Sequence, residues 1–334
     1  MARIVAAFGT SHSTMLMSAL EHWLVMFDHV DRRAPIYDFA GRRRSFDELL
    51  ACLPPEAAAR VAPAAMIRRF EQAQSAMTRL AGDIADARLD ALIVVGDDQR
   101  EVFQDSLRPA IGIYYGATVR NAAAPTPPPD DWYTRDQHKR MEDGRDVHYP
   151  VHAGLAAHLI EELSSRHFDI TAIQALPAER FEGHAFSFVH RRYLAGHHLP
   201  IVPVFLNTYY PPNQPSPARC LELGRALHEA VLRFSDDLRV GVMASGGLSH
   251  FLVNEALDHQ VIDALRRKDP AQLAGLDPSL LQSGSSEIRN WICVAAAARD
   301  LDLDWISYVP GYRSRALTGV GLCFARWAPV SAAP

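Results

Sequence analysis

Four short apolar runs along the chain each end in small or polar residues. A continuous apolar run of this length, bounded by Gly, Asn or Asp, is typical of a strand that is covered on both faces of a sheet. We therefore predict four buried strands, over residues 3–8, 89–96, 199–206 and 240–245.

Between these runs, apolar residues recur at helical spacing. The clearest case is residues 63–85, where one side of the predicted helix carries Ile67, Phe70, Ala73, Met77, Leu80 and Ile84. Further helices are predicted over residues 155–164, 217–234, 255–267 and 285–298. Strands that alternate with helices indicate an α/β fold. We expect a central mixed sheet with helices on both faces and the active site at the strand ends.

Two segments interrupt this alternation. Residues 27–55 are rich in Arg and Asp, and residues 122–149 contain a cluster of prolines and several charges. We expect both to be irregular insertions, either surface excursions or loops that bind a ligand. The sequence contains no internal repeat and no clear linker, so we expect a single domain over residues 1–334.

The composition, with 48% hydrophobic and 22% charged residues, is that of an ordinary soluble globular protein. The formal net charge of -5 gives no electrostatic reason to expect a nucleic acid or an anionic membrane as partner. No apolar run approaches the roughly 20 residues that span a bilayer, and the N-terminus lacks the pattern of a signal peptide. The four cysteines are scattered without metal-binding spacing, as reduced thiols are, so we expect a cytoplasmic protein.

Polar side chains follow each predicted strand directly. His12 follows the first, Asp97–Gln99 the second, Asn207 the third and His250 the fourth, with Glu255 shortly beyond. The strand ends of an open α/β sheet can meet in one crevice, where ligands bind. Histidine and carboxylate side chains there suit a non-haem iron(II) site, although zinc hydrolases use similar ligands, so these residues do not choose the metal. A lone histidine is more often structural, so only convergence makes His12 a ligand.

His184 is the second histidine of interest. It follows a loop and precedes an aromatic-rich segment, and an imidazole titrates near neutral pH, so it can act as an acid/base. A surface histidine that makes one hydrogen bond explains the same pattern equally well. The sequence contains no G-x-G-x-x-G, P-loop or G-x-S-x-G motif, which disfavours nucleotide-dependent and serine-hydrolase chemistry.

Several short motifs occur in an order that resembles one enzyme superfamily. They are Gly9-Thr10-Ser11-His12, Asp97-Asp98-Gln99 with Glu101-Val102-Phe103, Gly183-His184, Asn207-Thr208 with residues 216–220, residues 245–250 with Asn254-Glu255, residues 286–291, and Gly319-Val320-Gly321. In this combination the chain resembles the class III, LigB-type extradiol ring-cleavage dioxygenases. Within them it is most similar to the branch of the 3-O-methylgallate and gallate dioxygenases and the protocatechuate 4,5-dioxygenase β subunit. The resemblance spans nearly the whole chain.

The resemblance implies a non-haem iron(II) enzyme of aromatic compound catabolism. Such an enzyme opens a catecholic ring, of the protocatechuate, gallate or methylgallate kind, beside its hydroxyls and inserts both atoms of dioxygen. The matching motifs imply His12 and Glu255 as iron ligands and His184 as the acid/base histidine. His250 matches a stretch beneath the site, where it is expected to assist catalysis by a hydrogen bond to a ligand. A homodimer suits this branch.

The chain departs from the family pattern at the second histidine ligand, where Gln99 stands. A glutamine carbonyl oxygen is a harder and weaker iron ligand than an imidazole. Three outcomes are open: Gln99, Asp98 or Asp97 supplies the third ligand, another histidine such as His148 or His152 does so, or the site binds metal poorly. Gln99 also favours an alternative to the enzyme, a homologue that keeps the fold without turnover. A further alternative is a homologue that keeps the metal and performs a different reaction.

Three further residues are expected to bind the substrate: Asn207, Arg219 and Asp98. An anionic substrate needs a cation in the pocket, and Arg219, Arg289 or Arg313 can supply it. The expected partners are therefore a small aromatic diol and dioxygen.

Overall fold

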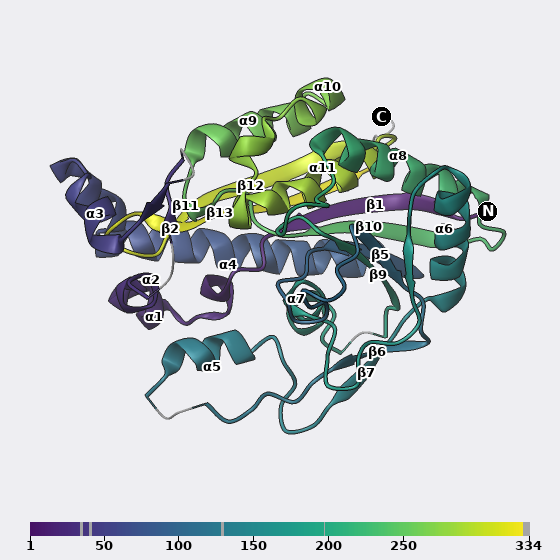
Figure 1. Ribbon diagram of the computed structural model, residues 1–334, viewed down its shortest axis with the longest axis horizontal. Coiled ribbons are helices and arrows are strands. Elements are labelled where there is room, and N and C mark those ends of the chain that lie inside the picture. Colours follow the sequence, from purple (N-terminus) through teal and green to yellow (C-terminus); the bar gives the residue numbers. More distant parts are fainter. Residues whose placement is uncertain (34–35, 40–41, 128–129, 197, 330–334) are drawn as a thin grey trace.

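The computed structural model describes residues 1–33, 36–39, 42–127, 130–196 and 198–329 (Figure 1). The four predicted strands are confirmed as β1 (Arg3–Thr10), β4 (Ala91–Gly96), β9 (Ile201–Leu206) and β10 (Arg239–Ser245). They lie side by side in the order β1-β10-β4-β9, and each neighbouring pair is parallel. Parallel strands in this position are covered on both faces, which explains their continuous apolar character.

Antiparallel strands extend this parallel core on both sides, so the sheet is mixed, as the sequence predicts. On one side β13 (Thr318–Ala328) pairs with β1, and it carries β12 (Asp302–Tyr312) and β11 (His250–Leu252). On the other side β5 (Ile111–Tyr114) pairs with β9 and β8 (Thr171–Ile173). The apolar pattern does not predict the long β12–β13 hairpin, because much of β12 is only half-buried and polar residues interrupt its apolar run.

Helices cover both faces of the sheet, and the predicted ones are confirmed (Figure 1). One face carries α6 (Ala153–Ser165), α8 (Pro217–Arg233), α9 (Glu255–Arg266) and α11 (Ile288–Ala297). The other face carries α4 (Pro63–Asp86) and α7 (His184–Tyr193). Alternation along β4 serves both layers, since Ile93 and Val95 pack on the first face and Leu92 and Val94 on the second.

The two segments expected to be irregular contain short elements instead of continuous loop. In the first lie α2 (Asp28–Asp31), the hairpin of β2 (Ile36–Tyr37) and β3 (Arg43–Arg44), and α3 (Phe46–Ala51). In the second lie α5 (Trp132–His138) and β7 (Val147–Pro150), which pairs with β6 (Thr118–Asn121). The remaining elements are α1 (Leu20–Val25), α10 (Pro270–Ala274) and the 3-10 turns Thr14–Met17, Pro55–Val61, Pro278–Leu280 and Ser283–Glu287.

The parallel core brings four chain segments to one edge of the sheet. Because β1, β10, β4 and β9 run in the same direction, their carboxyl ends meet there. The residues that follow these ends include His12, Asp97, Asn207 and His250. Among the described residues, no helix combines the length and the apolar character that a membrane crossing needs.

Replacement of two helical glycines by alanine should change the stability of the protein in opposite directions. A Cβ atom at Gly224 of α8 lies 2.0 Å from the carbonyl oxygen of Cys293 in α11, whereas one at Gly82 of α4 meets nothing within 4 Å. Gly224→Ala should therefore destabilise the protein by about 1–3 kcal/mol, because the two helices must separate. Gly82→Ala should stabilise it by about 0.5–1 kcal/mol through helix propensity. Urea denaturation of both variants measures this, and a stabilised Gly224→Ala protein contradicts the close packing.

Candidate metal centre

Four buried side chains converge at the carboxyl edge of the sheet: His12, Asp97, His184 and Glu287. Each offers one ligand atom, and the four atoms all lie within 4.8 Å of one another. His12 Nε2 lies 3.3 Å from Glu287 Oε2 and 3.9 Å from Asp97 Oδ1. His184 Nε2 lies 3.9 Å from Asp97 Oδ2. These atoms come from four separate segments, so only the folded sheet assembles them.

The hydroxyl of Ser245 fixes the tautomer of His12. Ser245 Oγ donates its only hydrogen to the carbonyl oxygen of Ala185, at 2.7 Å. It must therefore accept the hydrogen bond of 3.0 Å that joins it to His12 Nδ1. The Nδ1–H form leaves a lone pair on Nε2, and this atom faces the two carboxylates. Burial, with the nearby His184, lowers the pKa of His12 to about 3, so the imidazole is neutral and suited to bind a metal.

The two carboxylates of the group are held by neutral donors. Glu287 Oε2 accepts a hydrogen bond of 2.6 Å from the backbone N–H of Gly247. The amide nitrogen of Gln99 lies between the carboxylates, 3.3 Å from Asp97 Oδ2 and 3.4 Å from Glu287 Oε1. Burial, and then the charge of Glu287, raise the pKa of Asp97 to about 6. A bound cation would relieve this repulsion.

His184 is the first residue of α7, and Glu101 anchors it there. One oxygen of Glu101 accepts hydrogen bonds from both the backbone N–H and Nδ1 of His184, at 2.9 Å and 2.5 Å. The other oxygen accepts from Arg140, at 3.0 Å. Burial alone would lower the pKa of His184, but the carboxylates of Glu101 and Asp97 outweigh it and raise that pKa to about 9. Without a metal, His184 is therefore an imidazolium whose Nε2–H points toward Asp97.

The unsatisfied atoms of the group fit a metal ion. Within the described part of the chain, His12 Nε2, Asp97 Oδ1 and His184 Nε2 are buried and make no hydrogen bond. A buried polar atom without a partner is costly, and such atoms in native proteins call for an explanation. His12 Nε2 and Asp97 Oδ1, together with the carboxylate of Glu287, form a nitrogen and oxygen donor set that suits a divalent transition metal.

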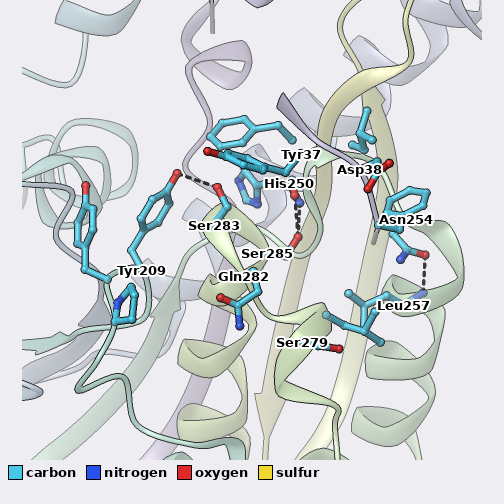
Figure 2. A pocket seen from close by; sticks show the side chains of 16 residues that line it. Tyr37, Asp38, Tyr209, His250, Asn254, Leu257, Ser279, Gln282, Ser283 and Ser285 are labelled. Atoms are coloured by element: carbon cyan, nitrogen blue, oxygen red, sulfur yellow. Dashed lines mark hydrogen bonds between the residues drawn. The ribbon is translucent and has the colours of Figure 1, made fainter. Parts of the chain in front are cut away.

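His250 connects the buried group with an open pocket. Its Nδ1–H donates to the carbonyl oxygen of Leu248 at 3.0 Å, and its Nε2 lies 3.7 Å from Glu287 Oε2. Gly247 permits this position, because a Cβ atom there would lie 2.5 Å from His250 Cε1. The same histidine lines a pocket of about 460 Å³ together with Tyr37 and Tyr209 (Figure 2). Burial lowers the pKa of His250, so its Nε2 is a free base.

The structure does not bring Glu255, the carboxylate expected as an iron ligand, to His12. Glu255 begins α9, and its side chain is 38% exposed. Its carboxylate accepts hydrogen bonds from Arg60 and from the hydroxyl of Tyr312. The buried carboxylate of the group is instead that of Glu287, in the 3-10 turn before α11.

The three residues expected to bind the substrate form hydrogen bonds or ion pairs with other residues of the protein. Asp98 accepts three backbone N–H groups of the following turn, and Asn207 is bonded to Tyr210 and Asn213. Arg219 lies on the surface of α8 and pairs with Glu222.

The other two arginines expected as substrate cations are buried. Arg289 donates to the carbonyl oxygens of Pro215 and Leu281, and Arg313 pairs with Asp31. Neither arginine lines the pocket beside His250.

His148 and His152, the alternative histidine ligands, also lie outside the buried group. His148 lies opposite Arg120 in the antiparallel pair of β6 and β7, and His152 caps the N-terminus of α6.

Glu287 and Glu101 lie in segments that belong to the sequence motifs, but no role is predicted for either residue from the sequence. Both lie in runs that carry the family resemblance, residues 286–291 and Glu101-Val102-Phe103. The signal that distinguishes Glu287 from Glu255 is its surroundings, since apolar residues dominate the helix that follows Glu287. That pattern places a carboxylate at the buried end of a core helix.

Comparison with known proteins adds one finding. A model of one protein family, described as the catalytic LigB subunit of aromatic ring-opening dioxygenase, matches residues 69–314. The match covers more than half of the chain. It includes Asp97, His184 and Glu287, whereas His12 precedes it.

The Ser245 hydroxyl predicts a measurable effect on metal affinity. Ser245→Ala removes the acceptor for His12 Nδ1–H, which frees the imidazole to adopt the other tautomer and rotate. We expect affinity for a divalent metal such as Fe(II) or Mn(II) to fall about 10- to 100-fold, as measured by anaerobic calorimetry. Ser286→Ala is the matched control, because the buried Ser286 hydroxyl has no hydrogen-bond partner in the described structure. Equal losses in both variants would exclude the tautomer argument.

Proposed function

Because this chain belongs to the family of catalytic LigB subunits of aromatic ring-opening dioxygenases, we propose that it catalyses extradiol cleavage of a catecholic ring, with insertion of both atoms of dioxygen. The observation that carries the proposal is the group of four buried metal-binding side chains beside an open pocket. We propose further that the enzyme is a single catalytic domain that acts in the cytoplasm as a homodimer.

In this proposal, His12, Asp97 and Glu287 hold iron(II). One neutral imidazole and two carboxylates balance the charge of a divalent ion and leave positions for other ligands. When bound, iron(II) supplies a Lewis acid for both hydroxyls of the diol and the redox chemistry that brings in dioxygen. Asp97 thus takes the place expected for a second histidine. Gln99 positions the two carboxylates through its amide nitrogen.

His250 is the proposed base for the substrate. It lies where the pocket meets the buried group, and its Nε2 carries a lone pair because Nδ1–H donates to Leu248. A neutral imidazole in this position can accept the proton of a substrate hydroxyl. The hydroxyl of Ser285 holds His250 in place, because it accepts from the backbone N–H of His250 and donates to its carbonyl oxygen.

His184 is the proposed acid. The raised pKa keeps a proton on Nε2 at neutral pH, and Glu101 keeps the ring oriented toward the group. Two histidines with opposite pKa shifts, one free base and one imidazolium, provide a proton acceptor and a proton donor at the same site. This pair favours an enzyme over a homologue that keeps only the fold.

Oxygen uptake tests the proposed activity. Protein reconstituted anaerobically with Fe(II) is mixed with a panel of catechols and gallates in aerated buffer. We expect stoichiometric oxygen uptake and a yellow ring-fission product with at least one diol. Metal binding without uptake across the panel supports the alternative, a metal-binding homologue with a different reaction. Absence of metal binding supports a homologue that retains only the fold.

Substitution of Glu287 and of Glu255 tests which of the two glutamates binds the metal. Glu287→Gln should reduce Fe(II) binding at least tenfold, whereas Glu255→Gln, on the surface beside Arg60, should bind Fe(II) as the unmodified protein does. His184→Gln and His250→Gln should keep the metal and lose turnover about 100-fold or more. Metal content after gel filtration and oxygen uptake measure the two effects. Loss of iron in Glu255→Gln alone would return the ligand role to Glu255.

A further inference from the structure

The orientation of His184 depends on one acceptor, the carboxylate of Glu101. Within the described residues, the imidazole makes a single hydrogen bond, from Nδ1 to Glu101 Oε2 at 2.5 Å, and its Nε2 is buried without a partner. The same oxygen accepts the backbone N–H of His184 at 2.9 Å. Gly183, with φ +82°, lets the carboxylate come this close to the start of α7, because a Cβ atom there would lie 3.3 Å from Glu101 Oε2. A rotation of this carboxylate would therefore free the imidazole to turn.

Arg140 holds the second oxygen of that carboxylate. Its Nη2 donates to Glu101 Oε1 at 3.0 Å, while Oε2 serves His184. In the described part of the chain, Arg140 is the one arginine or lysine that pairs with Glu101. Burial alone would raise the pKa of Glu101, but His184 and Arg140 outweigh it and lower that pKa to about 2, so the carboxylate is charged and accepts at both oxygens. Each oxygen is thus held from a different segment by charge-assisted hydrogen bonds, which opposes rotation.

The fold fixes the backbone of Arg140 as well. This residue follows α5 in the segment 122–149, and its carbonyl oxygen accepts from Asn121 Nδ2 at 3.1 Å. Asn121 belongs to β6 and is fully buried, so this anchor lies inside the protein. The side chains of Arg140 and Glu101 are only 26% and 16% exposed. A pair so far from water, with both partners anchored, differs from the mobile surface pairs that contribute little.

Contacts of α5 explain why Arg140 reaches the site. This helix lies against the 3-10 turn that follows β1 (Figure 1). Asp136 of α5 is buried and accepts from His22 Nδ1 at 2.6 Å. Lys139 Nζ lies 2.6 Å from Asp136 Oδ1 and donates to the carbonyl oxygen of Met17 at 2.9 Å. The segment is therefore packed against the chain that follows β1, which keeps Arg140 beside the site.

We propose that Arg140 is a positioning residue for the proposed reaction: its guanidinium fixes the carboxylate of Glu101, which in turn aims the imidazole of His184 at the buried group. This inference rests on the proposed function, which gives the orientation of His184 its purpose. It also assigns a role to the segment 122–149, which completes the site from outside the sheet.

Proton NMR of the metal-free protein tests the orientation of His184 without turnover. The Nδ1 proton of His184 lies in a hydrogen bond to a charged carboxylate and is shielded from water, so it should give a downfield resonance that exchanges slowly. Loss of this resonance in His184→Gln assigns it. We expect Arg140→Met to broaden or remove it, because the carboxylate of Glu101 becomes mobile.

Arg145→Met is the matched control, because Arg145 is an exposed arginine of the same segment, and it should keep the resonance. Arg140→Gln also removes the guanidinium and replaces Arg140→Met if that variant does not fold, with the same loss expected. An unchanged resonance in the Arg140 variants, or its absence from the unmodified protein, overturns the inference.

Steady-state oxygen uptake by the Fe(II)-loaded protein gives the second test. Misplacement of the acid slows proton transfer and does not weaken binding of the diol, so Arg140→Met should lower kcat about 10- to 100-fold and leave KM and iron content nearly unchanged. Guanidinium ion added to Arg140→Ala should restore kcat several-fold, whereas Arg145→Ala should not respond to it. A kcat unchanged in Arg140→Met, or a parallel loss of iron, contradicts the positioning role.

The two tests separate this inference from the proposed function. If the unmodified protein takes up no oxygen with any diol, the activity is refuted, and the NMR result still decides whether Arg140 orients His184. If uptake occurs and Arg140→Met behaves as the unmodified protein in both tests, the positioning role is refuted and the proposed dioxygenase activity stands.

Discussion

The close approach of two buried carboxylates, Asp97 and Glu287, is the constraint on which the site depends. Like charges in a buried position repel strongly and have lost their hydration, so the fold must supply donors or a cation. Gln99 and the backbone N–H of Gly247 supply neutral donors. They leave one Asp97 oxygen and the Nε2 atom of His12 without partners. A divalent metal is the simplest group that satisfies all of them.

The same electrostatics sets the protonation of the histidines. Burial and the nearby His184 hold His12 neutral, whereas Glu101 and Asp97 hold His184 protonated. His250, with its Nδ1–H on a carbonyl oxygen, is neutral as well. Of the three imidazoles, only that of His184 is charged, and it is the one whose Nδ1–H donates to a carboxylate. This separation of roles is what the proposed proton transfers require.

A residue of the site can be predicted from the sequence when its neighbours in the chain determine its position, and not when contacts between distant segments do so. Position at a strand end is local, so His12, Asp97 and His250 are recognisable from the apolar runs that precede them. The choice between Glu255 and Glu287 is not local, since both lie at the start of a helix. The contacts of α9 leave Glu255 beside Arg60, whereas α11 packs against β10 and β1 and carries Glu287 to the site. Gln99 was expected to replace a ligand, but its amide nitrogen faces the carboxylates.

By itself, the sequence determined the α/β alternation, the four parallel core strands, most of the helices and the segments from which the site is built. These features follow from periodicity and from residues adjacent in the chain, which act over a few ångströms. Only the tertiary structure decided which carboxylate joins His12, which nitrogen of each imidazole is free, and that aromatic residues line the pocket beside His250. Those properties depend on contacts between segments far apart in sequence, such as Tyr37 with the Tyr209 and Ser283 side of the pocket. Packing of the whole sheet and its helices fixes them.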